Sequence, residues 1–162
     1  MKKFVTLLLT AALAVTAATT AFADDTATQI GPSTTPPSKA IDVTYTVNPS
    51  YTVTIPANIT LNTDAPSTAT VTAENVTIPC NQKLKVTLNS KNNFYVITNE
   101  GAKGTYTVKK DNSTTPISNG ATVLEANYGT KSTVLTFEFQ KKNVTYSGEY
   151  KDTVTFNVSV GN

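Results

Sequence analysis

Apolar and polar residues alternate with a period of two along most of the chain after residue 40. The pattern is clearest in five segments, which are 43–47, 51–55, 84–88, 135–139 and 154–160. In each of them Val, Leu, Ile, Phe or Tyr takes every second position, and a polar residue, most often Thr, takes the others. This alternation is typical of strands with one face in a core and the other in water. Since Thr and Val also favour extended backbone, the chain is predicted to be all-β.

Turn signals between these segments indicate how the strands are arranged. They recur about every 8 to 12 residues, the spacing expected of a sandwich or barrel, and they fall at residues 62–66, 91–93, 99–104, 118–120 and 128–130. The parity of the apolar positions slips between Ala73 and Val76, which predicts a bulge or tight turn near Glu74 and Asn75. We therefore expect eight or nine strands in an antiparallel two-sheet sandwich of immunoglobulin-like form.

The first 40 residues differ in composition from the rest. Lys2 and Lys3 precede an apolar run, and Ala21-Phe22-Ala23 has the small-x-small pattern of a cleavage site, so residues 1–23 are predicted to be a signal peptide. Residues 24–40 are rich in Thr, Ser and Pro and are expected to be disordered. Residues 41–162 then form a single β-sandwich domain. A secreted or cell-surface location follows, and without a second spanning run we expect no membrane insertion after cleavage.

The segment Ile41–Val47 admits two interpretations. Its four apolar residues alternate cleanly behind the flexible leader, so it suits a strand donated to the edge of a neighbouring sheet. The short turn at residues 48–50 instead favours a local hairpin, in which the segment is the domain's own first strand and pairs with residues 51–55.

Charge and residue types exclude several classes of function. Removing Lys2 and Lys3 from the 13 basic residues leaves 11 lysines against 11 acids, so the processed chain lacks the positive field that attracts nucleic acid. The chain has no His to act as a base, its acids are scattered, and one Cys cannot form a zinc cluster. We expect no enzyme, no catalytic residue, no cofactor and no metal site.

Cys80 is the only cysteine and excludes an internal disulfide. Because it follows the strand-like run from Val76 to Pro79, it is predicted to be a small buried or half-buried filler. A disulfide to another chain remains the alternative.

Three tyrosines are the candidates for a ligand site. Tyr95, Tyr128 and Tyr146 lie in or beside predicted loops, where exposed rings can stack on sugars and neighbouring Asn side chains can supply hydrogen bonds. A carbohydrate-binding module is therefore the alternative function. A lone loop tyrosine such as Tyr128 also serves to pack its own loop.

The closing segment carries a resemblance to known proteins. Residues 146–158 read YSGEYKDTVTFNV, with a glycine, then Tyr-x-Asp-Thr, then an alternating strand. This ending resembles that of secreted bacterial surface sandwich domains, including the spore-coat-protein-U type of pilus subunit and the WxL cell-wall domains, although neither Trp-x-Leu motif is present. Residues 43–47 and 51–56 fit the same group of Thr-rich exported proteins. The resemblance implies an extracellular structural or adhesive role, with the chain itself, other surface proteins or glycans as partners.

Three residues of this ending are interpreted as determinants of the fold. Gly148 lets the chain turn into the last strand. Tyr150 shares the inward parity of Val154 and Phe156, so its ring can join the core while its hydroxyl reaches a backbone group. Asp152 has the same parity near the strand start, where it can cap loop amides or pair with a lysine.

Overall fold

The computed structural model describes residues 31, 38, 40–141 and 144–162. They belong to two units: one contains residues 48–162, and the other contains the described residues up to Val47. The predicted signal peptide, residues 1–23, and nearly all of the predicted disordered leader lie outside the described residues.

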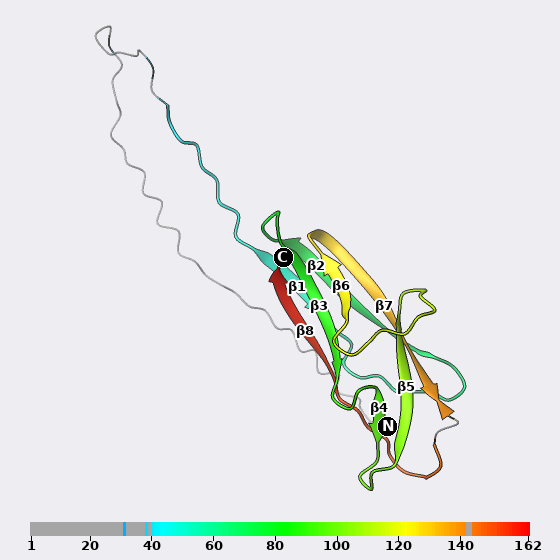
Figure 1. Cartoon of the computed structure of the whole chain (residues 1–162). Coiled ribbons are helices and arrows are strands. Elements are labelled where there is room, and N and C mark those ends of the chain that lie inside the picture. Colours follow the sequence, from blue (N-terminus) through cyan, green and yellow to red (C-terminus); the bar gives the residue numbers. More distant parts are fainter. Residues whose placement is uncertain (1–30, 32–37, 39, 142–143) are drawn as a thin grey trace, which may run out of the picture. The chain divides into compact units, whose positions relative to one another are not determined.

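The larger unit consists of eight strands in two antiparallel sheets (Figure 1). The strands are β1 (Ser50–Thr54), β2 (Ser67–Thr77), β3 (Lys83–Ser90), β4 (Tyr95–Ile97), β5 (Lys103–Lys110), β6 (Thr122–Ala126), β7 (Tyr128–Gln140) and β8 (Val154–Gly161). The five-stranded sheet has the order β1-β2-β7-β5-β4 and the three-stranded sheet has the order β6-β3-β8. The predicted all-β, two-sheet antiparallel sandwich is confirmed. Its immunoglobulin-like character stays a prediction.

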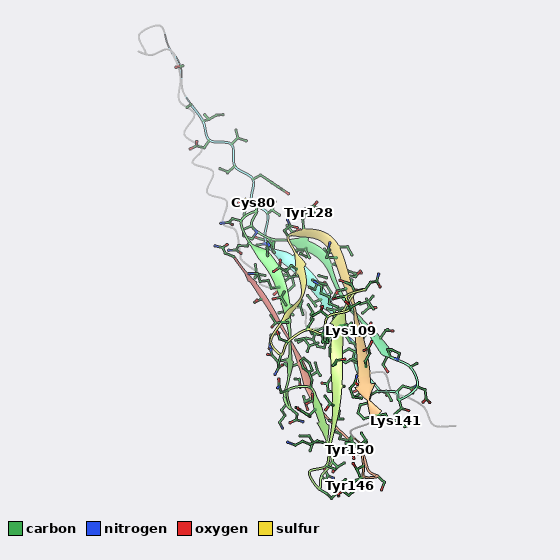
Figure 2. All side chains as sticks on the ribbon, turned by 45° about the vertical axis from the view of Figure 1, so that its right-hand side comes forward. Cys80, Lys109, Tyr128, Lys141, Tyr146 and Tyr150 are labelled. Atoms are coloured by element: carbon green, nitrogen blue, oxygen red, sulfur yellow. The ribbon has the colours of Figure 1, made fainter. Side chains whose placement is uncertain are left out.

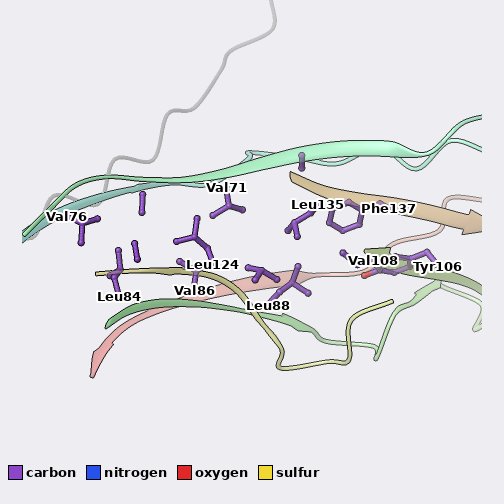
Figure 3. Close-up of a cluster of buried hydrophobic side chains, with 14 of the residues drawn as sticks. Val71, Val76, Leu84, Val86, Leu88, Tyr106, Val108, Leu124, Leu135 and Phe137 are labelled. Atoms are coloured by element: carbon purple, nitrogen blue, oxygen red, sulfur yellow. The ribbon is translucent and has the colours of Figure 1, made fainter. Parts of the chain in front are cut away.

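Alternating apolar side chains of both sheets form one core. Val71 of β2 and Leu135 of β7 come from the five-stranded sheet, and Leu84, Val86 and Leu88 come from β3 in the other. All five are fully buried, and Figure 3 shows their side chains pointing into the space between the sheets. The period of two therefore places these side chains as it predicts.

The structure confirms the predicted bulge and corrects one predicted turn. Asn75 has a φ of 53°, and the pairing of β2 with β7 shifts register between Ala73 and Val76. The residues 128–130 do not form a turn but open β7, where Gly129 has a φ of 69° and pairs with Val76 across the bulge. Glycine tolerates this left-handed conformation, so it accommodates the shift within a continuous strand.

The segment Ile41–Val47 does not form the predicted first strand. No strand occurs in residues 40–49, and β1 begins at Ser50. The side chains of Ile41, Val43, Tyr45 and Val47 are 76%, 90%, 91% and 59% exposed. The predicted local hairpin is therefore not formed.

Among the residues that the structure describes, no helix is long and apolar enough to cross a membrane.

Candidate functional site

The edge strand β8 exposes part of its inward face. Val158 pairs with Val86 and Val160 pairs with Leu84 across the sheet. Residues directly opposite each other in an antiparallel pair share a face, so both valines point the same way as their fully buried partners. Each valine is nevertheless 36% exposed. The core is therefore uncovered along this edge.

Strand β1, at the edge of the other sheet, shows the same feature. Val53 pairs with the fully buried Ala73 and therefore faces inward. Tyr51 and Ile55 share the parity of Val53, yet they are 40% and 37% exposed. Two inward-facing apolar rows, one in each sheet, thus remain accessible.

A cleft of about 960 Å³ lies between the loop that follows β1 and the first residues of β8. One wall is the loop after β1, residues 56–61, and the other is formed by residues 148–154, which lead into β8. Tyr106, Phe137 and Phe139 also line it. Val154 and Phe156 of the β8 row line the cleft, and the loop in its other wall follows directly after the β1 row. We call the cleft with the inward rows of both strands the open seam.

The open seam and the segment Ile41–Val47 have matching patterns. The β8 side presents Val154, Phe156, Val158 and Val160, which are four apolar residues at every second position. The segment also presents four apolar residues at every second position over seven residues. At about 3.4 Å per residue, both rows span roughly 20 Å when extended. A strand with the pattern of Ile41–Val47 therefore has the length and the apolar period needed to cover the inward row of β8.

Asp152 ties the two sheets together beside the cleft. Its Oδ2 accepts hydrogen bonds from the Ser90 hydroxyl and the Tyr106 hydroxyl, both at 2.6 Å. Its Oδ1 accepts from the backbone N–H groups of Asn92 at 3.1 Å and Thr153 at 2.8 Å. The carboxylate thus caps loop amides, as its parity suggested, and none of the lysines in the described part of the chain bonds to it.

Tyr106 stays protonated in this network. Burial raises the pKa of its hydroxyl well above the ordinary value, and the hydrogen bond to the Asp152 carboxylate raises it further. The Tyr106 ring lies edge-on to Phe94 at 5.6 Å and stacked with Phe137 at 6.2 Å between centroids. Tyr106 is therefore a fixed hydrogen-bond donor between the two walls of the cleft.

Tyr150 and Gly148 belong to the wall that leads into β8. The Tyr150 hydroxyl donates to the backbone carbonyl of Tyr146 at 2.8 Å, and its ring packs against the core. Gly148 has a φ of 142°, and an added Cβ would meet the Thr98 side chain at 3.4 Å. Both residues hold the turn that leads into β8.

The three candidate sugar-binding tyrosines do not form one platform. Figure 2 shows Tyr128 at the same end of the sandwich as Cys80 and Tyr146 at the opposite end. Tyr128 is the first of the thirteen residues of β7 and Tyr146 follows the last of them, so roughly 40 Å of extended strand lies between the two. Tyr95 is in β4, where its ring lies 5.8 Å from the Lys103 amino group. The three tyrosines therefore do not form one shared surface, and sugar binding at any one of them stays a prediction.

Cys80 is exposed, which corrects its predicted role as a buried filler. Strand β2 ends at Thr77, three residues earlier, and Cys80 lies in the turn that leads to β3. Pro79 cannot donate to a β-ladder, so the strand pattern does not extend to Cys80.

The described part of the chain holds no group of three or more His, Cys, Asp or Glu side chains that would suit a metal ion.

The ion pair Lys109–Glu138 joins β5 to β7, with 2.8 Å from the Lys109 Nζ to each carboxylate oxygen. The pairs Lys83–Glu125 and Lys151–Glu149 are largely exposed.

Comparison with known proteins found no matching family model, no matching curated protein and no matching solved structure. The proposed function therefore rests on the exposed apolar residues of the open seam.

Proposed function

We propose that the chain is an exported, non-enzymatic structural subunit of the pilin-like kind, which assembles outside the cell by strand addition. In this proposal the segment Ile41–Val47 of one copy fills the open seam of a second copy. An added strand extends a sheet through main-chain hydrogen bonds, and its alternate side chains select the site.

One observation carries the proposal. Inward-facing apolar residues of β1 and β8 are exposed, and the segment Ile41–Val47 of the same chain has an exposed apolar row with the same period. Val158 and Val160 point into the core and remain accessible, and Val43 and Tyr45 are almost fully exposed. Exposed apolar residues arranged in a contiguous row mark interaction surfaces. In the proposed assembly a single partner strand covers both rows.

The energies make this association possible but finely balanced. Burying a large apolar side chain contributes about 1.5–3 kcal/mol, so the four residues of the segment contribute about 6–12 kcal/mol. Association costs about 4–15 kcal/mol in lost freedom of motion. Because the two ranges overlap, one charge placed in the apolar row is expected to prevent assembly.

The test compares residues 24–162 with two single variants, each carrying one new charge. Val43→Asp places the charge in the apolar row, and Thr44→Asp places the same charge on the other face of the segment. Size-exclusion chromatography and electron microscopy are expected to show oligomers for the parent and for Thr44→Asp, and folded monomers for Val43→Asp. A chain that lacks residues 24–47 should also be monomeric. If that truncated chain is as oligomeric as the parent, strand donation is wrong.

A further inference from the structure

Because Ile41–Val47 is joined directly to β1 through residues 48–49, pairing with its own sandwich competes with pairing to a second copy. A segment tethered to its own sandwich has an effective concentration of about millimolar, far above that of a second copy. Self-pairing would therefore be expected to prevent assembly unless something disfavours it. The segment is nevertheless exposed and forms no strand.

We propose that the junction Asn48-Pro49-Ser50 bars the segment from filling its own chain's seam and so reserves it for a second copy. This inference rests on the proposed function. It concerns one property of the same site, namely the choice between self-pairing and pairing with another copy.

The parity of the chain excludes the tightest hairpin. A two-residue loop at Asn48 and Pro49 would set Thr44 opposite Val53. Opposed residues share a face, and Val53 faces inward because it pairs with the buried Ala73. This loop would thus turn the threonines of the segment inward and its apolar row toward water, which is the penalty of a one-residue slip.

A three-residue loop restores the correct parity. With residues 48–50 in the loop, Tyr45 lies opposite Val53 and Val47 lies opposite Tyr51, so the apolar rows face the same way. A longer loop of odd length would take Val47 and Tyr51 out of the pairing. Among hairpins with β1, only the three-residue loop therefore aligns the whole segment with the inward row of that strand.

The chemistry of the junction opposes this loop. Three-residue hairpin loops usually consist of a type I turn followed by a left-handed residue, which is most often Gly. Pro49 would occupy the second central position of that turn, where proline is disfavoured because it forces Asn48 out of the right-handed helical region. Ser50 would need the left-handed conformation, which costs a non-glycine residue energy.

Ser50 is also already part of the sandwich, where the three-residue loop would have to remove it from β1. It opens β1 and pairs with Thr77 of β2. Its hydroxyl donates to the Asn75 carbonyl at 3.4 Å. None of the three junction residues has a positive φ, whereas four other described non-glycine residues do, which are Asn75, Asn93, Phe94 and Asp111.

The test rebuilds the junction in residues 24–162. Pro49→Asp with Ser50→Gly creates the loop Asn-Asp-Gly, which suits the three-residue hairpin with the correct parity. Pro49→Gly is the matched control, because Asn-Gly favours the two-residue hairpin with the wrong parity. Sedimentation velocity over a range of concentrations measures the association of each.

We expect the double variant to close on itself and its apparent dissociation constant to rise about tenfold or more, because only the open fraction can associate. Hydrogen exchange at high dilution should show protected amides in residues 41–47 of this variant, which separates closure from loss of the fold. Pro49→Gly should associate like the parent.

Two results would overturn the inference. One is a double variant that associates as strongly as the parent or leaves residues 41–47 unprotected at high dilution, and the other is a Pro49→Gly chain that is equally closed. A parent that stays monomeric at every concentration contradicts the proposed function itself, so the two failures are distinguishable.

Discussion

Asp152→Asn should destabilise the sandwich strongly, because the carboxylate accepts four hydrogen bonds with two oxygens. The Oδ2 atom accepts from the hydroxyls of Ser90 and Tyr106, and the Oδ1 atom accepts from the backbone of Asn92 and Thr153. An amide keeps one accepting oxygen and replaces the other with a donor. Two of the four donors then face an N–H group instead of an acceptor.

The loss can be estimated from these contacts. A hydrogen bond to a charged group contributes about 1.5–3 kcal/mol, so two lost bonds correspond to about 3–6 kcal/mol. Asp152 is partly exposed, and water can satisfy some of the orphaned donors, so we expect the lower end, about 3 kcal/mol. This is a large fraction of the 5–15 kcal/mol by which domains are usually stable.

Urea unfolding followed by far-UV circular dichroism measures the change, since the chain has no tryptophan to report by fluorescence. The comparison is made at a concentration where parent and variants are monomeric. Asp111→Asn is the matched control, because Asp111 accepts from Thr133 and Val134 through one oxygen only, which an amide retains. An Asp152→Asn chain within about 0.5 kcal/mol of the parent, which is the usual range for surface changes, would refute the reasoning.

Three further predictions concern the core, the pH dependence and the thiol. The raised pKa of Tyr106 in the folded state means that its contribution to stability is complete below the ordinary tyrosine pKa of about 10 and is lost as the pH rises beyond it. Urea unfolding at about pH 8 and above pH 10 should show this loss in the parent, and Tyr106→Phe should show a smaller one. Gly104→Ala should lower the free energy of unfolding by about 1–3 kcal/mol. The added Cβ would lie 2.9 Å and 3.0 Å from Phe139 ring atoms, and thermal unfolding tests this. Cys80 should react with one equivalent of maleimide in the native protein, and a thiol that reacts only after unfolding would contradict its exposed position.

The alternation of apolar residues predicted the strands and their inward faces but not the open seam. The pattern in residues 154–160 tells which side chains point inward, and the structure agrees through the pairing of β8 with β3. Whether another strand covers those side chains depends on the order of strands in the other sheet. A local pattern carries no information on that order.

The hydrogen-bond partners of Asp152 could likewise be predicted only in part from the local sequence. Its inward parity near the start of the strand was predicted, with loop amides or a lysine as the expected partners. The hydroxyl of Ser90 lies 62 positions away in the chain and that of Tyr106 lies 46 positions away. Nothing in the sequence pairs these residues, because the folded sheets alone bring them together.

The hairpin predicted for residues 41–55 failed for a different reason. The short loop at residues 48–50 satisfied the length rule, but the rule also requires residues that tolerate a positive φ. Ser50 does not meet that requirement at the third loop position, and Pro49 is disfavoured at the second, so the loop chemistry opposes this hairpin. Pro49 therefore already disfavours this hairpin at the level of the sequence, whereas the donated strand stays a proposal.

Hydrogen exchange measured by mass spectrometry over a series of protein concentrations tests the central claim most directly. We predict that the amides of residues 41–47 exchange freely in dilute monomers and become protected as the protein associates. Residues 51–55 and 154–160, which border the open seam, should gain protection in parallel. Free exchange of residues 41–47 in assembled protein would contradict the account.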